Sequence, residues 1–191
     1  LRQLANANEL QSELGGDLGA TRVPQGKSSK WTNALGFWDI YADTIDHPEI
    51  TGLESWGRIA LGAVSGRNSF FALNEATANE YDLRPSDLLP LSPPGSQHLR
   101  ALSLTEDDVA VLTARGKRTA LFAPTKPSVG ARAYIAHGES LEIDQAYKCR
   151  IRTPWWRVPL QQPADLLITY MNADTVALCS NEARVRHLNS V

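Results

Sequence analysis

The segment from Tyr147 to Pro159 constrains this chain more than any other stretch, because it concentrates charge and aromatic area in thirteen residues. Its large aromatic and basic side chains are Tyr147, Lys148, Arg150, Arg152, Trp155, Trp156 and Arg157. No acid lies between Asp144 and Asp165, although Asp and Glu outnumber Lys and Arg by 21 to 19 in the whole chain. The surplus of positive charge is therefore local to this proline-bounded segment.

Two interpretations of the segment remain open. Lys and Arg bind phosphates, and unstacked bases bind aromatic faces, so the pattern favours contact with nucleic acid. The alternation of Lys148, Arg150 and Arg152 is equally typical of the solvent face of a half-buried strand. In that case Cys149 and Ile151 would face inward, and the two tryptophans would belong to the core.

The same segment resembles part of the C-terminal specificity region of TaqI-like, adenine-specific DNA methyltransferases. Residues 61–73 are similar to that family's Gly-(Ile/Val)-x-Thr-Gly-x-Asn-x-Phe-Phe-x-Leu pattern, with Ser65 in place of Thr and Ala63 in place of the aliphatic residue. Further similar segments follow in the family's order at residues 133–139, 168–172, 181 and 187–190. The resemblance extends from about residue 31 to the C-terminus.

Two motifs of a complete methyltransferase are not found in this sequence. One is the Gly-rich loop that opens the S-adenosylmethionine site, and the other is the (Asn/Asp)-Pro-Pro-(Tyr/Phe) loop that holds the target adenine. Pro93-Pro94 follows Ser92 and precedes Gly95, which is typical of a turn. We therefore expect no catalytic, cofactor-binding or metal-binding residue in this chain. The resemblance implies an upstream catalytic domain that binds S-adenosylmethionine.

The resemblance also implies a fold and a partner. We expect an α+β domain with a mainly antiparallel β-sheet and short flanking helices over residues 31–191, preceded by an N-terminal helix and linker at residues 1–30. This domain would recognise double-stranded DNA for a restriction-modification or phage-defence system in the cytoplasm of a bacterium or archaeon. The adenine would be flipped out of the duplex for methylation.

The residues expected to contact DNA fall into three groups. Lys148, Arg150, Arg152 and Arg157 would bind phosphates, with one arginine reading a guanine edge. Arg67 and Asn68 follow Gly66 at a tight connection and would approach DNA, with Asn68 suited to an adenine edge. One of Trp155 and Trp156 would be core and the other exposed for a contact.

Composition limits the other classes of function. The chain has 42% apolar residues, and neither a membrane-length apolar run nor a signal-peptide pattern occurs in its sequence. Cys149 and Cys179 are expected to be buried thiols in a reducing compartment.

The net charge of −2 is atypical of a free-standing DNA binder. It favours an alternative, a structural or protein-interaction domain on the same scaffold. A small RNA-binding module is disfavoured by the missing RNA-binding signatures.

Local patterns predict the secondary structure. Helices or helical turns are expected at residues 1–14, at 75–81 after the cap Asn74, at 82–91, from 105, at 127–137 and at 182–188. The helix at 127–137 would bury Val129, Ala133, Ile135 and Ala136. Strands are expected at 58–64, 69–73, 121–122, 148–152, 157–160, 166–171 and 176–180.

Overall fold

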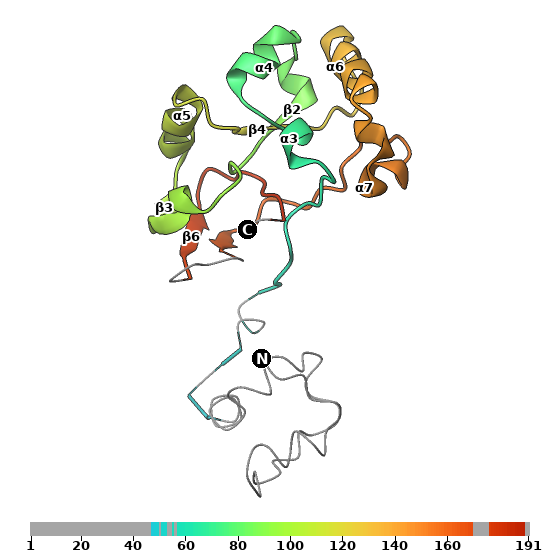
Figure 1. Cartoon of the computed structure of the whole chain (residues 1–191). Helices are drawn as coiled ribbons and strands as arrows, with labels where there is room; N and C mark the ends of the chain where they lie inside the picture. The colour runs from blue at the N-terminus through green and yellow to red at the C-terminus, as the bar shows by residue number, and fades with distance from the viewer. Residues whose placement is uncertain (1–46, 50, 53–54, 56, 170–175, 190–191) are drawn as a thin grey trace, which may run out of the picture. The chain divides into compact units, whose positions relative to one another are not determined.

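The computed structural model describes residues 47–49, 51–52, 55, 57–169 and 176–189 (Figure 1). The chain divides into two units, Leu1–Ile59 and Ala60–Val191, and the elements below all belong to the second. The predicted helix at 1–14 and the linker that follows it lie outside the described residues.

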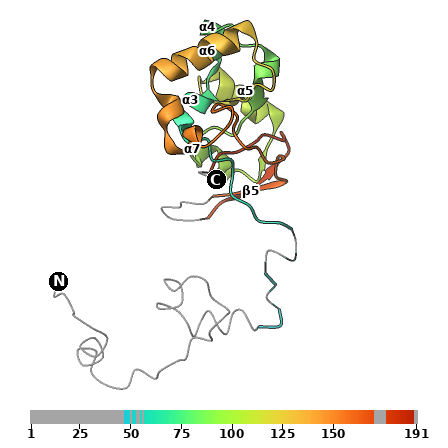
Figure 2. The ribbon, with the colours of Figure 1, turned by 90° about the vertical axis from the view of Figure 1, so that its right-hand side faces the viewer.

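The first of two small sheets is antiparallel throughout. Its central strand β4 (Ala120–Phe122) lies between β1 (Ala72–Leu73) and β2 (Leu88–Pro90), with Leu121 opposite Ala72 and Leu89. The helices that accompany this sheet are α3 (Asn68–Phe71), α4 (Glu75–Glu80), the 3-10 turn η2 (Pro85–Asp87) and α6 (Val129–Ser140). Figure 2 shows α6 and α4 together at one end of the unit.

The second sheet pairs distant segments. Strand β6 (Leu178–Asn181) lies between β3 (Ser103–Leu104), which is parallel to it, and β5 (Leu166–Ile168), which is antiparallel. The 3-10 turn η3 (Gln97–Arg100) and helix α5 (Glu106–Ala114) flank β3, and η4 (Ile143–Gln145) and α7 (Tyr147–Arg150) follow α6. The expected α+β class, with mainly antiparallel strands and short helices, is confirmed.

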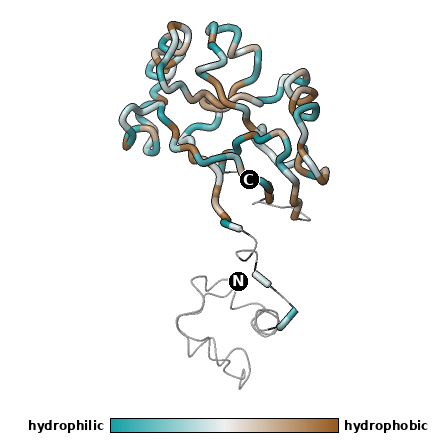
Figure 3. The backbone as a smooth tube through the Cα atoms, turned by 180° about the vertical axis from the view of Figure 1, so that it is seen from behind, coloured by the Kyte–Doolittle hydropathy of each residue, from teal (hydrophilic) through white to brown (hydrophobic). Residues whose placement is uncertain are grey.

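Each sheet has its own hydrophobic core. The larger core is aromatic: Phe70 stacks on Tyr134 with ring centroids 4.5 Å apart, and Phe122 meets Tyr134 edge-on at 4.9 Å. The Tyr134 hydroxyl donates a 2.8 Å hydrogen bond to the Phe70 carbonyl, and burial raises the pKa of this tyrosine. The smaller core contains Leu99, Leu104, Leu167, Cys179 and Val185. Figure 3 shows the hydrophobic residues gathering toward the middle of the unit.

Asp87 joins the start of α6 to η2. Its fully buried carboxylate accepts hydrogen bonds from the Arg84 and Ser128 amides at 3.0 and 3.1 Å and from the Ser128 hydroxyl at 2.6 Å. Ser128 in turn caps α6 through the Ala131 amide. The backbone of α6 lies so close to the turn at the end of α4 that a Cβ on Gly130 would sit 2.1 Å from the Tyr81 carbonyl oxygen. Helix α6 is therefore fixed in place at its N-terminal end.

The two helices whose start was predicted from a capping residue, α4 and α5, are confirmed. The Asn74 side chain accepts the Thr77 amide at the start of α4, and Thr105 and Asp108 form a reciprocal capping box at the start of α5. The buried thiols of Cys149 and Cys179 are confirmed as well.

We expect Thr105→Ala to lower the free energy of unfolding by about 1 kcal/mol, because it leaves the first turn of α5 without its hydroxyl acceptor. Urea denaturation of the variant measures this loss. Thr125→Ala, at an exposed residue whose hydroxyl makes no hydrogen bond in the described part of the chain, serves as a control for threonine removal. An unchanged midpoint for Thr105→Ala would contradict the capping role.

Several predicted strands are wrong. Residues 147–150 form helix α7 in place of a strand, and Ile151 is 60% exposed although the strand pattern placed it inward. The strand predicted at 69–73 is confirmed at residues 72–73, which form β1, whereas residues 69–71 belong to helix α3. The segments at 58–64 and 157–160 form no strand, and the first contributes one isolated bridge, from Ala63 to Leu188. Over so few residues the pattern fits both periodicities, because Cys149 faces inward in a strand and in a helix alike.

The C-terminal predictions and the face of α6 need smaller corrections. Residues 182–188 form a turn and two bridges in place of a helical turn. Strands β5 and β6 confirm the strands expected near 166 and 176, while residues 170–171 lie outside the described part. Helix α6 buries Ala131, Tyr134 and Ile135, whereas Val129, Ala133 and Ala136 are exposed. The aromatic Tyr134 fixes this face because its ring packs among those of Phe70 and Phe122.

Candidate nucleic-acid interface

A tight turn precedes α3, and we name residues 65–68 the tip. Gly66 has φ of +90°, a conformation that glycine adopts without strain. The buried Ser65 hydroxyl donates to Oδ1 of Asn68 and accepts the Arg67 amide at 3.2 Å. Asn68 is half-buried and Arg67 is exposed. The turn therefore presents Arg67 outward and holds Asn68 by its amide oxygen.

Helix α7 packs directly on the tip. A Cβ built on Gly66 would lie 2.9 Å from Cβ of Lys148 and 3.2 Å from Sγ of Cys149. The Cys149 thiol points at the Ser65 carbonyl, with 3.7 Å between sulfur and oxygen, across 84 positions of sequence. Burial raises the pKa of this thiol, and the neighbouring charges of Arg152 and Arg67 oppose that effect. Two segments with predicted DNA-contacting residues thus form one surface.

Arg152 holds this surface together. Its guanidinium donates hydrogen bonds to two consecutive backbone carbonyls, that of Ser65 at 2.7 Å and that of Val64. Partial burial lowers its pKa. Hydrogen bonds from a charged donor stabilise more than neutral ones, so this side chain fixes the tip against α7. A phosphate contact by Arg152 stays a prediction.

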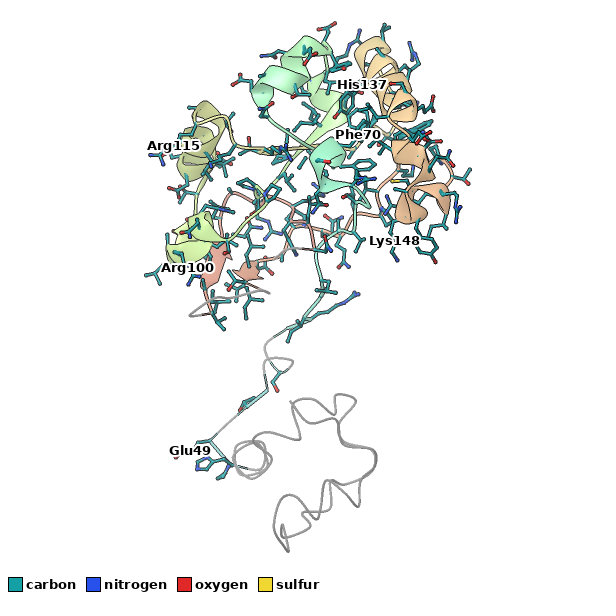
Figure 4. The ribbon with its side chains drawn as sticks, in the orientation of Figure 1. Glu49, Phe70, Arg100, Arg115, His137 and Lys148 are labelled. Atoms are coloured by element: carbon teal, nitrogen blue, oxygen red, sulfur yellow. The ribbon has the colours of Figure 1, made fainter. Side chains whose placement is uncertain are left out.

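The other predicted cations point into solvent. Lys148, Arg150, Arg157 and Arg67 are exposed, and in the described part of the chain none of them is paired with a carboxylate. The ion pair that the described residues do form, Arg184 with Asp165, belongs to another region. Figure 4 shows Lys148 below α7, across the unit from Arg115. These cations keep their hydrogen-bonding capacity for an anionic ligand.

Both tryptophans are half-buried against the aromatic core. The Trp155 ring lies 5.6 Å from Phe70 and 6.0 Å from Trp156, centroid to centroid, and its Nε1 donates to Glu139 at 3.1 Å. Their packing anchors the segment after α7 to α6. The assignment of one ring to the core and the other to DNA stays a prediction.

An open groove of about 520 Å³ runs beside α7. It is lined by Leu61, Gly62, Ala63, Val64, Lys148, Ile151, Arg152, Pro159 and Gln161. Sequence reasoning missed the outward-facing apolar residues here, Leu61 and Ile151, which are 56% and 60% exposed. The exposure of Ile151 could have been predicted from its position four residues after Tyr147, because residues at this spacing share one face of a helix. A strand places the two residues on the same inward-facing side as Cys149 and gives no such signal.

The described residues show little else that could carry chemistry. They contain no group of three or more His, Cys, Asp or Glu side chains placed to hold a metal ion. Ser92 lies 2.7 Å from Nε2 of His98, but the serine is 2% exposed, so a substrate could not reach it. Among these residues no helix has the length and apolar character needed to cross a bilayer.

Comparisons with known proteins place the chain in a family. The family described as the C-terminal domain of the type II methyltransferase M.Eco57I matches residues 28–191. The type II methyltransferase M.AccI of Acinetobacter calcoaceticus is 25% identical over 157 residues, which cover 80% of this chain and 29% of that protein. The chain thus spans less than a third of this relative's length, and no solved structure matches it. The chain belongs to the family of C-terminal domains typified by that of M.Eco57I.

Proposed function

We propose that this domain binds double-stranded DNA as the target-recognition part of a type II methyltransferase that modifies N6 of adenine. The observation that carries the proposal is the contact of the tip with α7, which gathers exposed, unpaired cations from two distant segments onto one surface. The family supplies the context of a type II methyltransferase. The resemblance to TaqI-like enzymes supports adenine as the target base.

The chemistry would lie in another domain. We propose an upstream catalytic domain that binds S-adenosylmethionine and receives the flipped adenine, in the cytoplasm of a bacterium with a restriction-modification or phage-defence system. The domain described here would supply DNA affinity and sequence reading. Methyl transfer needs the cofactor's methyl group held close to the amine, which a DNA-binding surface alone does not provide.

The geometry refines the proposed role of each contact. Lys148, Arg150 and Arg157 are free to bind phosphates, whereas Arg152 is engaged with the backbone. Asn68 reads adenine most fully when its amide both donates and accepts. Ser65 occupies one lone pair of the Asn68 Oδ1, so the second lone pair and Nδ2 are left to accept from and donate to an adenine edge.

The distribution of charge weakens the main objection to DNA binding. Residues 60–191 contain 14 Lys and Arg against 13 Asp and Glu, whereas residues 1–59 contain 5 against 8. The acidic surplus of the chain thus lies outside the unit that carries the surface. A mildly basic unit with clustered cations is compatible with a domain that shares DNA with a catalytic partner.

A protein-interaction role is the second candidate, and one observation favours it. The outer face of β5 and β6 exposes Leu166, Ile168 and Leu178 by 56%, 40% and 53%, while Leu167 and Cys179 face the core. An apolar sheet face of this kind is suited to cover by another protein surface. The two roles are compatible if the catalytic domain is that partner. If the chain showed no DNA affinity at moderate salt, protein interaction would be the one role of the two that still stands.

Single substitutions test the DNA-binding proposal. We expect Lys148→Gln, Arg150→Gln and Arg157→Gln each to flatten the plot of log affinity against log salt by about 0.9, because each phosphate contact releases counterions. These slopes are measured on the whole chain by fluorescence anisotropy, with a pool of random-sequence duplexes as the ligand. Arg132→Gln, on the exposed side of α6, is the control. Slopes that match wild type in all three variants would contradict the proposal.

A further inference from the structure

Helix α7 carries an apolar ridge on its exposed side. Tyr147 and Ile151 are 63% and 60% exposed, while Cys149 between them is fully buried. Residues four apart on a helix share one face, and Ile151 directly follows the last residue of α7. The two side chains therefore stand together, pointing away from the core. Two large apolar side chains next to each other on an exposed face form a candidate contact surface.

Cations stand on both sides of this ridge. Successive helical residues turn by about 100°, so Lys148 and Arg150 flank the line from Tyr147 to Ile151 on opposite sides. Both are exposed, and Nζ of Lys148 lies 5.4 Å from the centre of the Tyr147 ring. The ridge and its flanks thus match a partner that has an apolar middle between two rows of negative charge. A duplex kinked at one base step, where apolar base faces are opened between the two phosphate strands, has this arrangement.

We infer that Tyr147 and Ile151 form a wedge that enters the duplex between base pairs and unstacks them while Lys148 and Arg150 hold the flanking phosphates. Leucine, isoleucine and other apolar side chains act in this way in proteins that kink DNA. The inference rests on the proposed function. It adds to phosphate binding a mechanical role, which lowers the cost of extruding a base for the catalytic domain.

The groove beside the ridge fits the same role. Leu61, Val64 and Pro159 give it an aliphatic lining next to Ile151, and Lys148 and Arg152 also border it. A displaced base has an apolar face and an attached phosphate, so this lining suits it better than it suits an intact duplex. The anchor is firm, because Cys149 and Arg152 fix α7 to the tip.

The test compares two DNA duplexes that differ in stacking. One is intact, and the other has the same sequence with one abasic site, where a wedge enters without breaking a stack. We expect the wild-type chain to bind the abasic duplex at least about tenfold more tightly, since the wedge then enters without unstacking a base step. The double variant Tyr147→Ser with Ile151→Ser should lose this preference and keep its salt slope. Ile151→Met should retain it, and Val129→Ser, at a residue 69% exposed on α6, should have no effect.

The outcomes separate the wedge from the function beneath it. No DNA binding by the wild-type chain at moderate salt would overturn the proposed function together with the wedge. Salt-dependent binding with equal affinity for the two duplexes, or with a preference that survives in the double variant, would overturn the wedge alone. In that case the ridge would be a protein-docking surface. Circular dichroism and urea denaturation check that each variant is folded before its ratio of affinities for the abasic and the intact duplex is compared with that of wild type.

Discussion

Replacing Gly66 with valine is expected to lower the free energy of unfolding by about 3 kcal/mol and to weaken DNA binding with it. The φ of +90° costs any other residue about 1–2 kcal/mol. The new Cβ would also lie 2.9 Å from Cβ of Lys148, and relieving such crowding costs about 1–3 kcal/mol more. The tip and α7 would have to separate, which divides the proposed surface.

Gly95 offers a matched control for the backbone cost. It has φ of +101°, and no atom lies within 4 Å of a Cβ built there. Gly95→Val should therefore lose about 1–2 kcal/mol, from backbone strain alone. Urea denaturation of the two variants gives the difference that belongs to the contact with α7. Equal losses would show that the tip does not pack on α7 as described.

Replacing Arg152 with alanine is expected to lower the free energy of unfolding by about 2–3 kcal/mol, because two backbone carbonyls lose a charged donor. Arg150 lies two positions away in the same basic segment, yet its side chain is exposed and makes no hydrogen bond in the described part of the chain. Arg150→Ala should therefore leave stability within about 0.5 kcal/mol of wild type. It should instead reduce the salt dependence of DNA binding.

The pair of arginine variants separates structural from DNA-contacting cations. Thermal or urea unfolding gives the stability of each, and anisotropy gives its salt slope. The expected pattern is a stability loss for Arg152→Ala and a slope change for Arg150→Ala. If Arg150→Ala destabilised the domain as much as Arg152→Ala, the assignment of Arg152 as the residue that joins tip and α7 would be wrong.

The elements that sequence reasoning predicted well are those with local causes. Asn74 and Thr105 cap their helices through amides three residues away, so the signal lies within one turn. The tight connection predicted at Gly66 also has a local cause, and the φ of +90° at this glycine confirms it. A strand and helix α7 both place Cys149 inward, and they differ at Ile151, which a strand would bury and α7 leaves exposed.

The interface shows where sequence reasoning stops. The motif resemblance picked out residues around 67 and around 150, but nothing in the sequence brought them together, because their contact depends on the packing of Gly66 against α7. Nor could the sequence show that Arg152 binds backbone carbonyls while Arg150 is exposed to solvent. A guanidinium binds a backbone carbonyl as readily as a phosphate, and only the fold decides which one is within reach.

The most direct test of the account compares two triple variants of equal charge change. One replaces Arg67, Lys148 and Arg150 with glutamine, and the other replaces three exposed cations that follow α5, Arg115, Lys117 and Arg118. Figure 4 shows Arg115 across the unit from Lys148. The salt slope of duplex binding is measured for each. If tip and α7 form the DNA-binding surface, the first variant should lose about 2.7 from its slope and the second almost nothing. Equal losses in the two variants, or a larger loss in the second, would contradict it.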